Sequence, residues 1–397
     1  MTRIRLTGAR VVLPDTVLED GDVTVTDGVI TGVAAGSGAP SRPGDADPAD
    51  ARHRPETVDL GGRWLVPGFV DMHVHGGGGA SYTAGDPDQG LAAAAFHREH
   101  GTTTTVASLV TAAPGQLRDS VAALAGLVED GILAGLHLEG PYLSRVRCGA
   151  HDPALLRAPD AAETDALVKA ARGTIRMVTL APELPGAVDL VRRLSDAGVV
   201  PAIGHTDATH RETQAALDAG ASVATHLFNA MRGLHHREPG PVAALLQDSD
   251  AVIELINDGV HLHPDIVSLT YQAAGASRIA LITDAMSAAG MPDGTYALGP
   301  VTTRVEAGIA RLADSDTIAG STLTLDRALR TAVHDNHLPI TDAVRSLTAT
   351  PAAALGLADT IGTIETGKCA DLVVLDHDLH VTAVMRHGRW TSTRGSS

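Results

Sequence analysis

The chain is short of aromatic residues. They make up 2% of its 397 residues, whereas hydrophobic residues as a whole make up 44%. A core must therefore be packed with Ala, Val, Leu and Ile, which also fill the interior of parallel barrels. This composition predicts a globular fold and excludes intrinsic disorder of the whole chain.

Cysteine and long apolar runs are also scarce. The two cysteines, Cys148 and Cys369, are too few for a disulfide framework, and neither belongs to a C-x-x-C pair that would indicate zinc or redox chemistry. No stretch reaches the ~18 apolar residues of a membrane-spanning helix, and residues 1–13 lack the continuous apolar segment of an export signal. We therefore expect a soluble protein of the reducing cytoplasm.

Basic residues are outnumbered by acidic ones. Lys and Arg number 30 and Asp and Glu number 47, so the formal net charge is -17. A field of this sign repels nucleic-acid phosphates and anionic membranes at long range. We expect neither as a partner, and an anionic ligand would need a local cation to bind.

Both ends of the chain have the pattern of short strands. Residues 1–35 alternate apolar and polar positions and contain turn signals, and residues 370–390 again contain strand-like apolar runs. Between residues 36 and 55 a Gly-, Pro-, Asp- and Ala-rich segment is typical of an exposed loop. We therefore expect residues 1–60 and 355–397 to build one small β domain that flanks a larger unit, residues 61–354.

In the larger unit, apolar β-rich runs alternate with Ala- and Leu-rich helical stretches. This alternation predicts parallel strands joined by crossover helices. An open doubly wound sheet is the alternative, but it needs no particular strand number and no nucleotide-binding fingerprint supports it. The expected strands number eight, which closes a (β/α)₈ TIM-type barrel and makes this an α/β chain. They lie at 67–73, 102–108, 132–138, 175–181, 199–204, 222–226, 251–257 and 278–283.

Residues able to bind metal follow these predicted strands one after another. Because the carboxyl ends of barrel strands meet at one mouth, residues far apart in sequence can gather there. His73 and His75 lie two residues apart, so both imidazoles would point the same way from an extended chain. Each residue alone could be an ordinary surface or core residue, but their coincidence at successive strand ends favours a metal site. The residues are His73, His75, Glu139, His205, His226, His261 and Asp284.

Such a site suits hydrolysis. A divalent metal lowers the pKa of bound water toward ~7, and a nearby carboxylate can then accept the water's proton and deliver it during amide cleavage. We predict this acid–base role for Asp284. Four further histidines lie in helical surroundings and are expected at the surface: His97, His100, His334 and His337.

Eight segments together resemble the N-acetylglucosamine-6-phosphate deacetylase family. The tail segment Gly367–Val373 is similar to that of amidohydrolases generally, whose two terminal segments form a small β-sandwich. Two positions depart from the family pattern: Arg147-Cys148, where relatives often carry lysine, and Phe228, where tyrosine is common. The segments are Pro67–Gly76, His137–Pro141, Gly149–His151, Gly204–Thr206, Thr225–Met231, Arg237–Gly240, Asp258–His261 and Thr283–Ala285.

The resemblance implies hydrolytic removal of the acetyl group from N-acetylglucosamine 6-phosphate. It implies one divalent ion at Glu139, His205 and His226, and capacity for a second at His73 and His75, with Asp284 beside them. Zinc is the first choice, and iron, manganese or another divalent ion is the alternative. Asp284 would accept and donate the proton, and His261 would polarise the acetyl carbonyl.

The resemblance also implies a homodimer and a set of substrate contacts. Ala150 and His151 would touch the sugar. The phosphate would be held by Asn229, Ala230 and Arg237, with Arg237 reaching in from the neighbouring subunit. The backbone of Ile318, Ala319 and Gly320 would line the ligand. The planar guanidinium of Arg237 suits a phosphate and supplies the local cation that the overall charge requires.

Three alternatives stay open to different degrees. A ring-opening amidohydrolase would need a carboxylated lysine after the fourth strand, and neither Lys169 nor Lys368 is placed to serve. Deacetylation of another N-acyl amino sugar, such as N-acetylgalactosamine 6-phosphate, is compatible with every motif. A non-catalytic barrel is disfavoured because no predicted ligand is missing.

Overall fold

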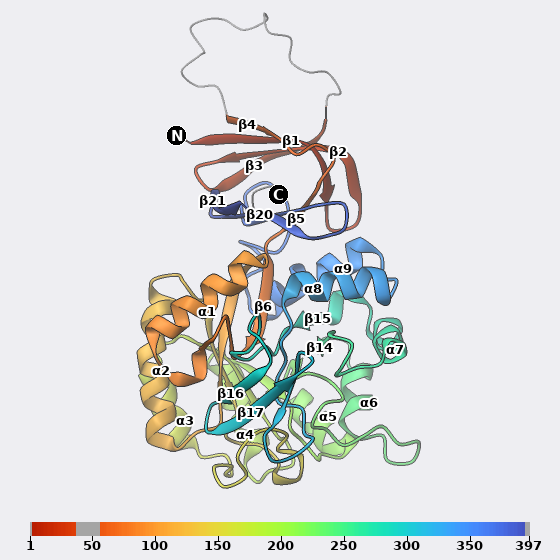
Figure 1. The fold of residues 1–397 in the computed structure, drawn as a ribbon. Helices are drawn as coiled ribbons and strands as arrows, with labels where there is room; N and C mark the ends of the chain where they lie inside the picture. The colour runs from red at the N-terminus through yellow and green to blue at the C-terminus, as the bar shows by residue number, and fades with distance from the viewer. Residues whose placement is uncertain (1, 37–55, 394–397) are drawn as a thin grey trace, which may run out of the picture.

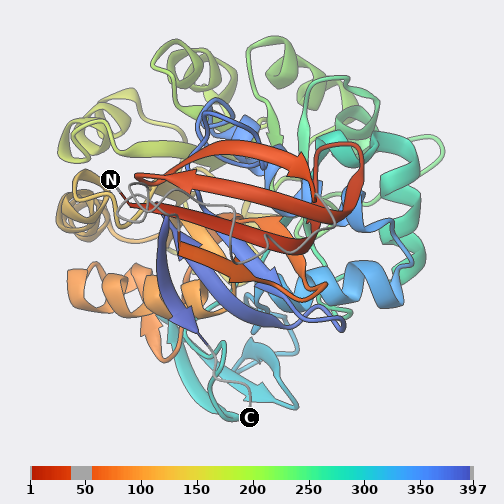
Figure 2. The same ribbon diagram turned by 90° about the horizontal axis from the view of Figure 1, so that it is seen from above.

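The computed structural model describes residues 2–36 and 56–393, so most of the loop predicted over 36–55 lies outside the described residues. Both ends of the chain contribute to one sheet, in the order β21-β20-β19-β5-β1-β2-β3, with β4 paired to β1. Figures 1 and 2 show β19–β21 lying beneath β1–β3, so the sheet forms two layers. The strands are β1 (Arg3–Val12), β2 (Val17–Thr26), β3 (Val29–Ala35), β4 (Glu56–Asp59), β5 (Trp64–Pro67), β19 (Leu372–Leu375), β20 (Val381–Arg386) and β21 (Arg389–Thr393).

The alternating residues of the terminal strands form the core of this small domain. Leu6, Val23, Leu65 and Val374 come from four different strands and are all buried in the same cluster. β5 pairs with β1 and with β19, although we had expected its residues in the barrel unit. A fully buried apolar run carries no period that tells one sheet from the other, so we now propose the domain boundary at Gly68.

The predicted barrel is confirmed. Within the described residues, eight parallel strands follow one another in the order β15-β14-β13-β12-β11-β10-β9-β6, and each overlaps a predicted strand. The helices between them form an outer ring (Figure 2). The strands are β6 (Phe69–Val74), β9 (Thr102–Val110), β10 (Gly135–Glu139), β11 (Ile175–Leu180), β12 (Val200–Ile203), β13 (Val223–Ala224), β14 (Val252–Ile256) and β15 (Ile279–Ile282).

The ring helices begin at residues suited to helix starts. The side chain of Asp86 accepts from the backbone N–H of Asp88 at the start of α1, and Thr209 with Glu212 forms a capping box at α5. The helices are α1 (Pro87–Glu99), α2 (Pro114–Glu129), α3 (Ala161–Ala170), α4 (Ala187–Asp196), α5 (His210–Asp218), α6 (Gly240–Gln247), α7 (Pro264–Ala274), α8 (Leu325–Arg330), α9 (Ile340–Leu347) and α10 (Ala349–Ala354). No helix in the described part of the chain is long and apolar enough to cross a membrane.

Polar contacts close the barrel between β6 and β15. The backbone N–H of Asp284 donates to the carbonyl of His73 at 2.9 Å. The buried carboxylate of Asp71 accepts from the hydroxyl of Thr283 at 2.6 Å and from its N–H at 3.3 Å. Burial raises the pKa of Asp71 to about 7, against the opposing effect of these hydrogen bonds. Asp71 therefore joins the first strand to the last.

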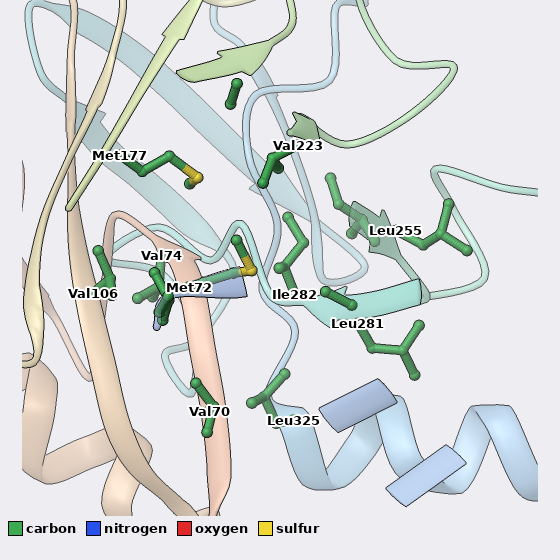
Figure 3. Packing of buried hydrophobic residues seen from close by; sticks show 14 of the residues in the cluster. Val70, Met72, Val74, Val106, Met177, Val223, Leu255, Leu281, Ile282 and Leu325 are labelled. Atoms are coloured by element: carbon green, nitrogen blue, oxygen red, sulfur yellow. The ribbon is translucent and has the colours of Figure 1, made fainter. Parts of the chain in front are cut away.

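Aliphatic and Met side chains fill the barrel core. Met72 and Met177 enter it from different strands and pack among Val, Leu and Ile (Figure 3). Unbranched Met side chains adapt to irregular gaps, so few aromatic residues are needed.

The barrel mouth lies away from the small domain. β5 leads directly into β6, and the small domain covers the end from which the strands start (Figure 1). After β15 a three-stranded sheet is inserted, whose residue Leu298 packs with Val110 and Met286. Its strands are β16 (Gly294–Leu298), β17 (Val301–Glu306) and β18 (Ile309–Leu312).

Candidate active site

The residues predicted as metal ligands gather at the barrel mouth and are buried: His73, His75, Glu139, His205, His226 and Asp284. His205, His226 and Asp284 adopt positive φ angles of 47°, 29° and 47°. Non-glycine residues rarely adopt this conformation, and it tends to persist where the surrounding structure enforces it at functional sites. Here it accompanies the turn of each side chain toward a common centre at the end of its strand.

Glu139, His205 and His226 form the first ligand group. Oε1 of Glu139 lies 3.0 Å from Nε2 of His205 and 3.0 Å from Nε2 of His226. The two imidazole nitrogens lie 3.1 Å apart. Ligands of a tetrahedral zinc ion, each about 2.0–2.1 Å from the metal, are separated by roughly 3.3 Å. The spacing of the three atoms is therefore close to that of a metal-binding set.

His73 and His75 form a second group beside the first. Their Nε2 atoms lie 3.2 Å apart. Nε2 of His75 also lies 3.1 Å from Oε2 of Glu139 and 3.1 Å from Oδ1 of Asp284. Oε1 of Glu139 therefore faces His205 and His226, and its Oε2 faces His75. The carboxylate lies between the two groups.

The tautomers of His75 and His205 indicate that their Nε2 atoms can bind a cation. Nδ1 of His75 lies 3.1 Å from the carbonyl of Ser108, and Nδ1 of His205 lies 3.0 Å from the carbonyl of Arg147. Because a carbonyl only accepts, each Nδ1 carries the hydrogen, and in the neutral ring Nε2 presents a lone pair. In the neutral rings these lone pairs face the carboxylate of Glu139, which also only accepts, so either a proton or a metal ion must lie between them. The site therefore suits a divalent metal.

The pKa shifts of His75 and Asp284 also indicate a site that attracts a cation. Burial alone would lower the pKa of His75, but its hydrogen bonds to Asp284 and Glu139 raise the pKa to about 9. Burial would raise the pKa of Asp284, but the charges of His73 and His75 hold it at about 2. Protons and a metal ion thus compete for nitrogens that the same carboxylates surround.

Glu254 supports this site and was not predicted. Its Oε2 lies 3.1 Å from Nδ1 of His73 and accepts from the backbone N–H of His226 at 3.2 Å. It is fully buried within β14. A carboxylate on the outer nitrogen of a ligating histidine fixes the orientation of the ring. The signal in the sequence was a charged residue inside an otherwise apolar strand.

A cavity of about 410 Å³ opens beside the ligands. Most of the predicted substrate residues line it, but two do not. Ala319 is buried behind the cavity, where its N–H donates to the carbonyl of Ala310. Arg237 is exposed, and its guanidinium lies 2.7 Å from Nε2 of His236. The predicted residues that line the cavity are Ala150, His151, Asn229, Ala230, His261, Ile318 and Gly320.

His151 lies at the edge of the metal site. Its Nδ1 accepts from the backbone N–H of Thr111 at 3.4 Å, so its Nε2 carries the hydrogen in the neutral ring. That nitrogen lies 3.4 Å from Oε2 of Glu139. Although its distance to Glu139 and His205 would permit a ligand role, this tautomer favours hydrogen-bond donation.

Asp258 is a second residue that sequence reasoning missed. Its Oδ2 lies 2.8 Å from Nδ1 of His261, and its Oδ1 accepts from the N–H groups of Val260 and His261. Burial would lower the pKa of His261, but the hydrogen bond and charge of Asp258 raise it, with a further contribution from Asp284. Asp258 thus favours the protonated form of His261 at the cavity wall.

One predicted surface histidine is in fact buried. His97 donates through Nε2 to the carbonyl of Gly76 at 2.9 Å, and burial lowers its pKa to about 4. α1 is pressed against the Gly76–Gly79 turn, where Cβ atoms would collide with Phe96 and His97. This close packing, which helical surroundings alone did not reveal, accounts for the error.

Comparison with known proteins agrees with this geometry. The sequence profile of the amidohydrolase family matches residues 64–391. The chain is 40% identical to N-acetylgalactosamine-6-phosphate deacetylase of Escherichia coli O157:H7, over 83% of this chain and 88% of that protein. It is 36% identical to N-acetylglucosamine-6-phosphate deacetylase of Vibrio furnissii, over 86% of each.

The fold also matches solved structures. A variant of N-acetyl-D-glucosamine-6-phosphate deacetylase from Mycobacterium smegmatis, in complex with N-acetyl-D-glucosamine-6-phosphate, superposes with a TM-score of 0.92 at 48% identity, covering 99% of this chain and 100% of that one. The profile and the relatives thus cover nearly the whole barrel, including every strand end that carries a ligand. The chain therefore belongs to the amidohydrolase family, whose members include metal-dependent hydrolases of this architecture.

Proposed function

We propose that this chain hydrolyses N-acetylglucosamine 6-phosphate to glucosamine 6-phosphate and acetate. The observation that carries the proposal is the set of mutually facing acceptors on Glu139, His205 and His226, placed beside Asp284 in a cavity. The activities named for the relatives support the substrate class. The galactosamine epimer is the second candidate, because the relative from Escherichia coli acts, by its name, on that sugar.

Glu139, His205 and His226 would hold one divalent ion, and His73, His75 and Asp284 would hold a second. Zinc suits this set of imidazoles and carboxylates, and iron or manganese would also be accepted. A bound ion activates water and polarises the acetyl carbonyl.

The protein's own groups would move the protons. Asp284 is ionised at neutral pH, since its pKa is held at about 2, and can accept the proton of the attacking water. As the water oxygen bonds to the acetyl carbon and the C–N bond breaks, Asp284 returns that proton to the leaving nitrogen. His261, whose protonated form Asp258 favours, would donate to the carbonyl oxygen as negative charge develops there.

The pair of Asp258 and His261 leads to a prediction about pH. Asp258→Asn keeps an oxygen at Nδ1 of His261 but removes the charge that raises its pKa. A proton on His261 is lost as the pH rises through that pKa, so the alkaline limb of kcat should move to lower pH. At a fixed alkaline pH kcat should therefore be lower in the variant than in the wild-type protein, whereas below the alkaline limb the two should agree. An alkaline limb that stays in place would contradict the role of the pair.

Arg237 leads to a prediction about substrate binding. We propose that it binds the phosphate of a neighbouring subunit's substrate, since it lies among the exposed residues 233–238, outside its own chain's cavity. Arg237→Ala should raise KM by roughly 10- to 100-fold, because charged hydrogen bonds contribute about 1.5–3 kcal/mol, and change kcat little. Arg192→Ala, on the exposed face of α4, is the matched control.

Mixing two subunits with different defects tests the homodimer. In a hybrid of Arg237→Ala and Asp284→Asn subunits, the intact Asp284 faces an intact Arg237 from its partner. Mixing should therefore produce sites that combine a low KM with a high kcat, which neither parent has. Failure to restore them, in a preparation that exchanges subunits, would place Arg237 outside the site.

The reaction itself is tested by acetate release from metal-loaded protein. N-acetylglucosamine 6-phosphate, N-acetylgalactosamine 6-phosphate and the unphosphorylated sugars form the panel. Preference for the first supports the proposal, and preference for the second supports the alternative. A metal-loaded sample that releases no acetate from any of them would refute both.

A further inference from the structure

Three loops at the barrel mouth meet around one carboxylate. We define loop A as residues 144–151, loop B as residues 204–209 and loop C as residues 225–239; they follow β10, β12 and β13. From loop B, Oδ1 of Asp207 lies 2.9 Å from Nε of Arg147 in loop A. Oδ2 of the same carboxylate lies 2.7 Å from Nη2 of Arg232 in loop C. Asp207 thus connects two loops that do not otherwise share an ion pair in the described structure.

Asp207 is itself held in place. The carboxylate of Glu183 accepts from the N–H of Asp207 at 2.7 Å and from the hydroxyl of Thr206 at 2.6 Å. The hydrogen bond from Arg232, against slight burial, lowers the pKa of Asp207, so the group stays ionised. Because its backbone is fixed, the position of the carboxylate fixes the two arginines that bind it.

The loops are also in contact on the side that faces the cavity. The N–H of Ser144 donates to the carbonyl of His205, and the N–H of Thr206 donates to the carbonyl of Ala230. At Gly149, which has φ +56°, an added Cβ would lie 3.0 Å from the ring of His205 and 3.6 Å from Cβ of Ala230. Gly149 therefore brings loop A against both the metal ligand and loop C.

The two connected loops carry the two ends of the proposed substrate site. Loop A contributes Ala150 and His151 to the cavity, and loop C contributes Asn229 and Ala230. A sugar phosphate that spans them requires a set distance between the loops. A single half-exposed ion pair is worth little, but one carboxylate shared by guanidiniums of two loops opposes the movement of either.

We propose that Asp207 is a positioning residue that holds loops A and C at the spacing a sugar phosphate requires. The inference rests on the proposed function, because it takes the cavity as the substrate site. Asp207 does not line the cavity, so its effect would pass through Arg147 and Arg232. Its loss should weaken substrate binding and leave the chemical step nearly unchanged.

Kinetics of four variants test this role. Asp207→Ala, Arg147→Gln and Arg232→Gln should each raise KM by about fivefold and keep kcat within about twofold, because binding is lost equally from ground and transition states. The double variant Asp207→Ala/Arg232→Gln should be no worse than either single variant, because both remove the same connection. Asp165→Ala, which breaks the exposed pair with Arg193 between α3 and α4, is the matched control.

Different outcomes would overturn the proposal. A lower KM in Asp207→Ala, with a higher KM in both arginine variants, would mean that the arginines simply attract the phosphate and Asp207 only neutralises them. Unchanged KM values, or additive effects in the double variant, would also exclude a shared connection.

Amide hydrogen exchange provides a readout independent of activity. In Asp207→Ala, amides in both loop A and loop C should exchange faster, and those of α3 should not. Absence of faster exchange would refute the positioning role, even if the wild-type protein is active. Faster exchange together with no acetate release from the wild-type protein would instead refute the proposed function alone.

Discussion

Asp284→Asn is expected to lower kcat by about 10²- to 10⁴-fold, the range that a positioned acid–base group contributes. The amide is nearly isosteric with the carboxylate but cannot accept the proton of the attacking water. Oδ1 of Asp284 lies 3.1 Å from Nε2 of His75, so the substitution also weakens the second ligand group. Glu139, His205 and His226 are untouched, and at least one ion should stay bound. Metal analysis of the same sample checks this.

A matched control separates the loss of the proton acceptor from the general effect of removing one negative charge. Asp119→Asn removes an exposed carboxylate on α2 and should leave kcat and metal content as they are. If Asp284→Asn retained full kcat with its metal bound, another group would have to carry the proton. A total loss of metal would mean instead that Asp284 acts chiefly as a ligand.

Glu139→Gln is expected to abolish both metal binding and turnover. The carboxylate faces imidazole nitrogens of both ligand groups at 3.0–3.1 Å, so no other residue touches so much of the site. In the variant, the neutral amide removes the charge that attracts the ion and points an N–H₂ group toward part of the site. Removal of the metal from the wild-type protein with a chelator should likewise abolish acetate release, and added zinc should restore it.

Thermal unfolding tests the same prediction without activity. An ion that binds only the folded state stabilises it by about 2.7 kcal/mol at a concentration 100 times its Kd. Addition of zinc to the metal-free wild-type protein should therefore raise Tm, whereas Glu139→Gln should show no metal-dependent rise. A rise of equal size in the variant would place the metal elsewhere.

Much of the catalytic architecture could be predicted because barrel strands carry strong local signals. Most predicted barrel strands were short apolar runs, and where a ligand was predicted it lay at or just after the end of its run, as for His205 and His226. The barrel topology then brings these residues together, because parallel strands place all their carboxyl ends at one mouth. The predictions of the barrel and of a shared ligand site needed nothing more than order and spacing.

The errors and omissions have a different origin. Glu254 and Asp258 support histidines at the site that they contact only in the folded chain. Glu254 was marked only by its charge inside an apolar strand, and Asp258 lay in a segment of the family resemblance that assigned it no role. His97 was assigned to the surface because its helix looked ordinary, but the glycine turn packed against α1 buries it. β5 was assigned to the wrong sheet because a short buried strand has the same composition in either.

The sequence by itself determined the barrel, the small domain built from both termini, and the residues that gather at the proposed metal site, because these follow from local periodicity and from the side-chain chemistry at strand ends. Only the tertiary structure decided which nitrogen of His75 and of His205 faces the proposed metal site, which carboxylates hold the histidines, and how Asp207 connects two loops. Those features depend on hydrogen bonds between residues distant in sequence, and their geometry exists only once the strands are closed into a barrel.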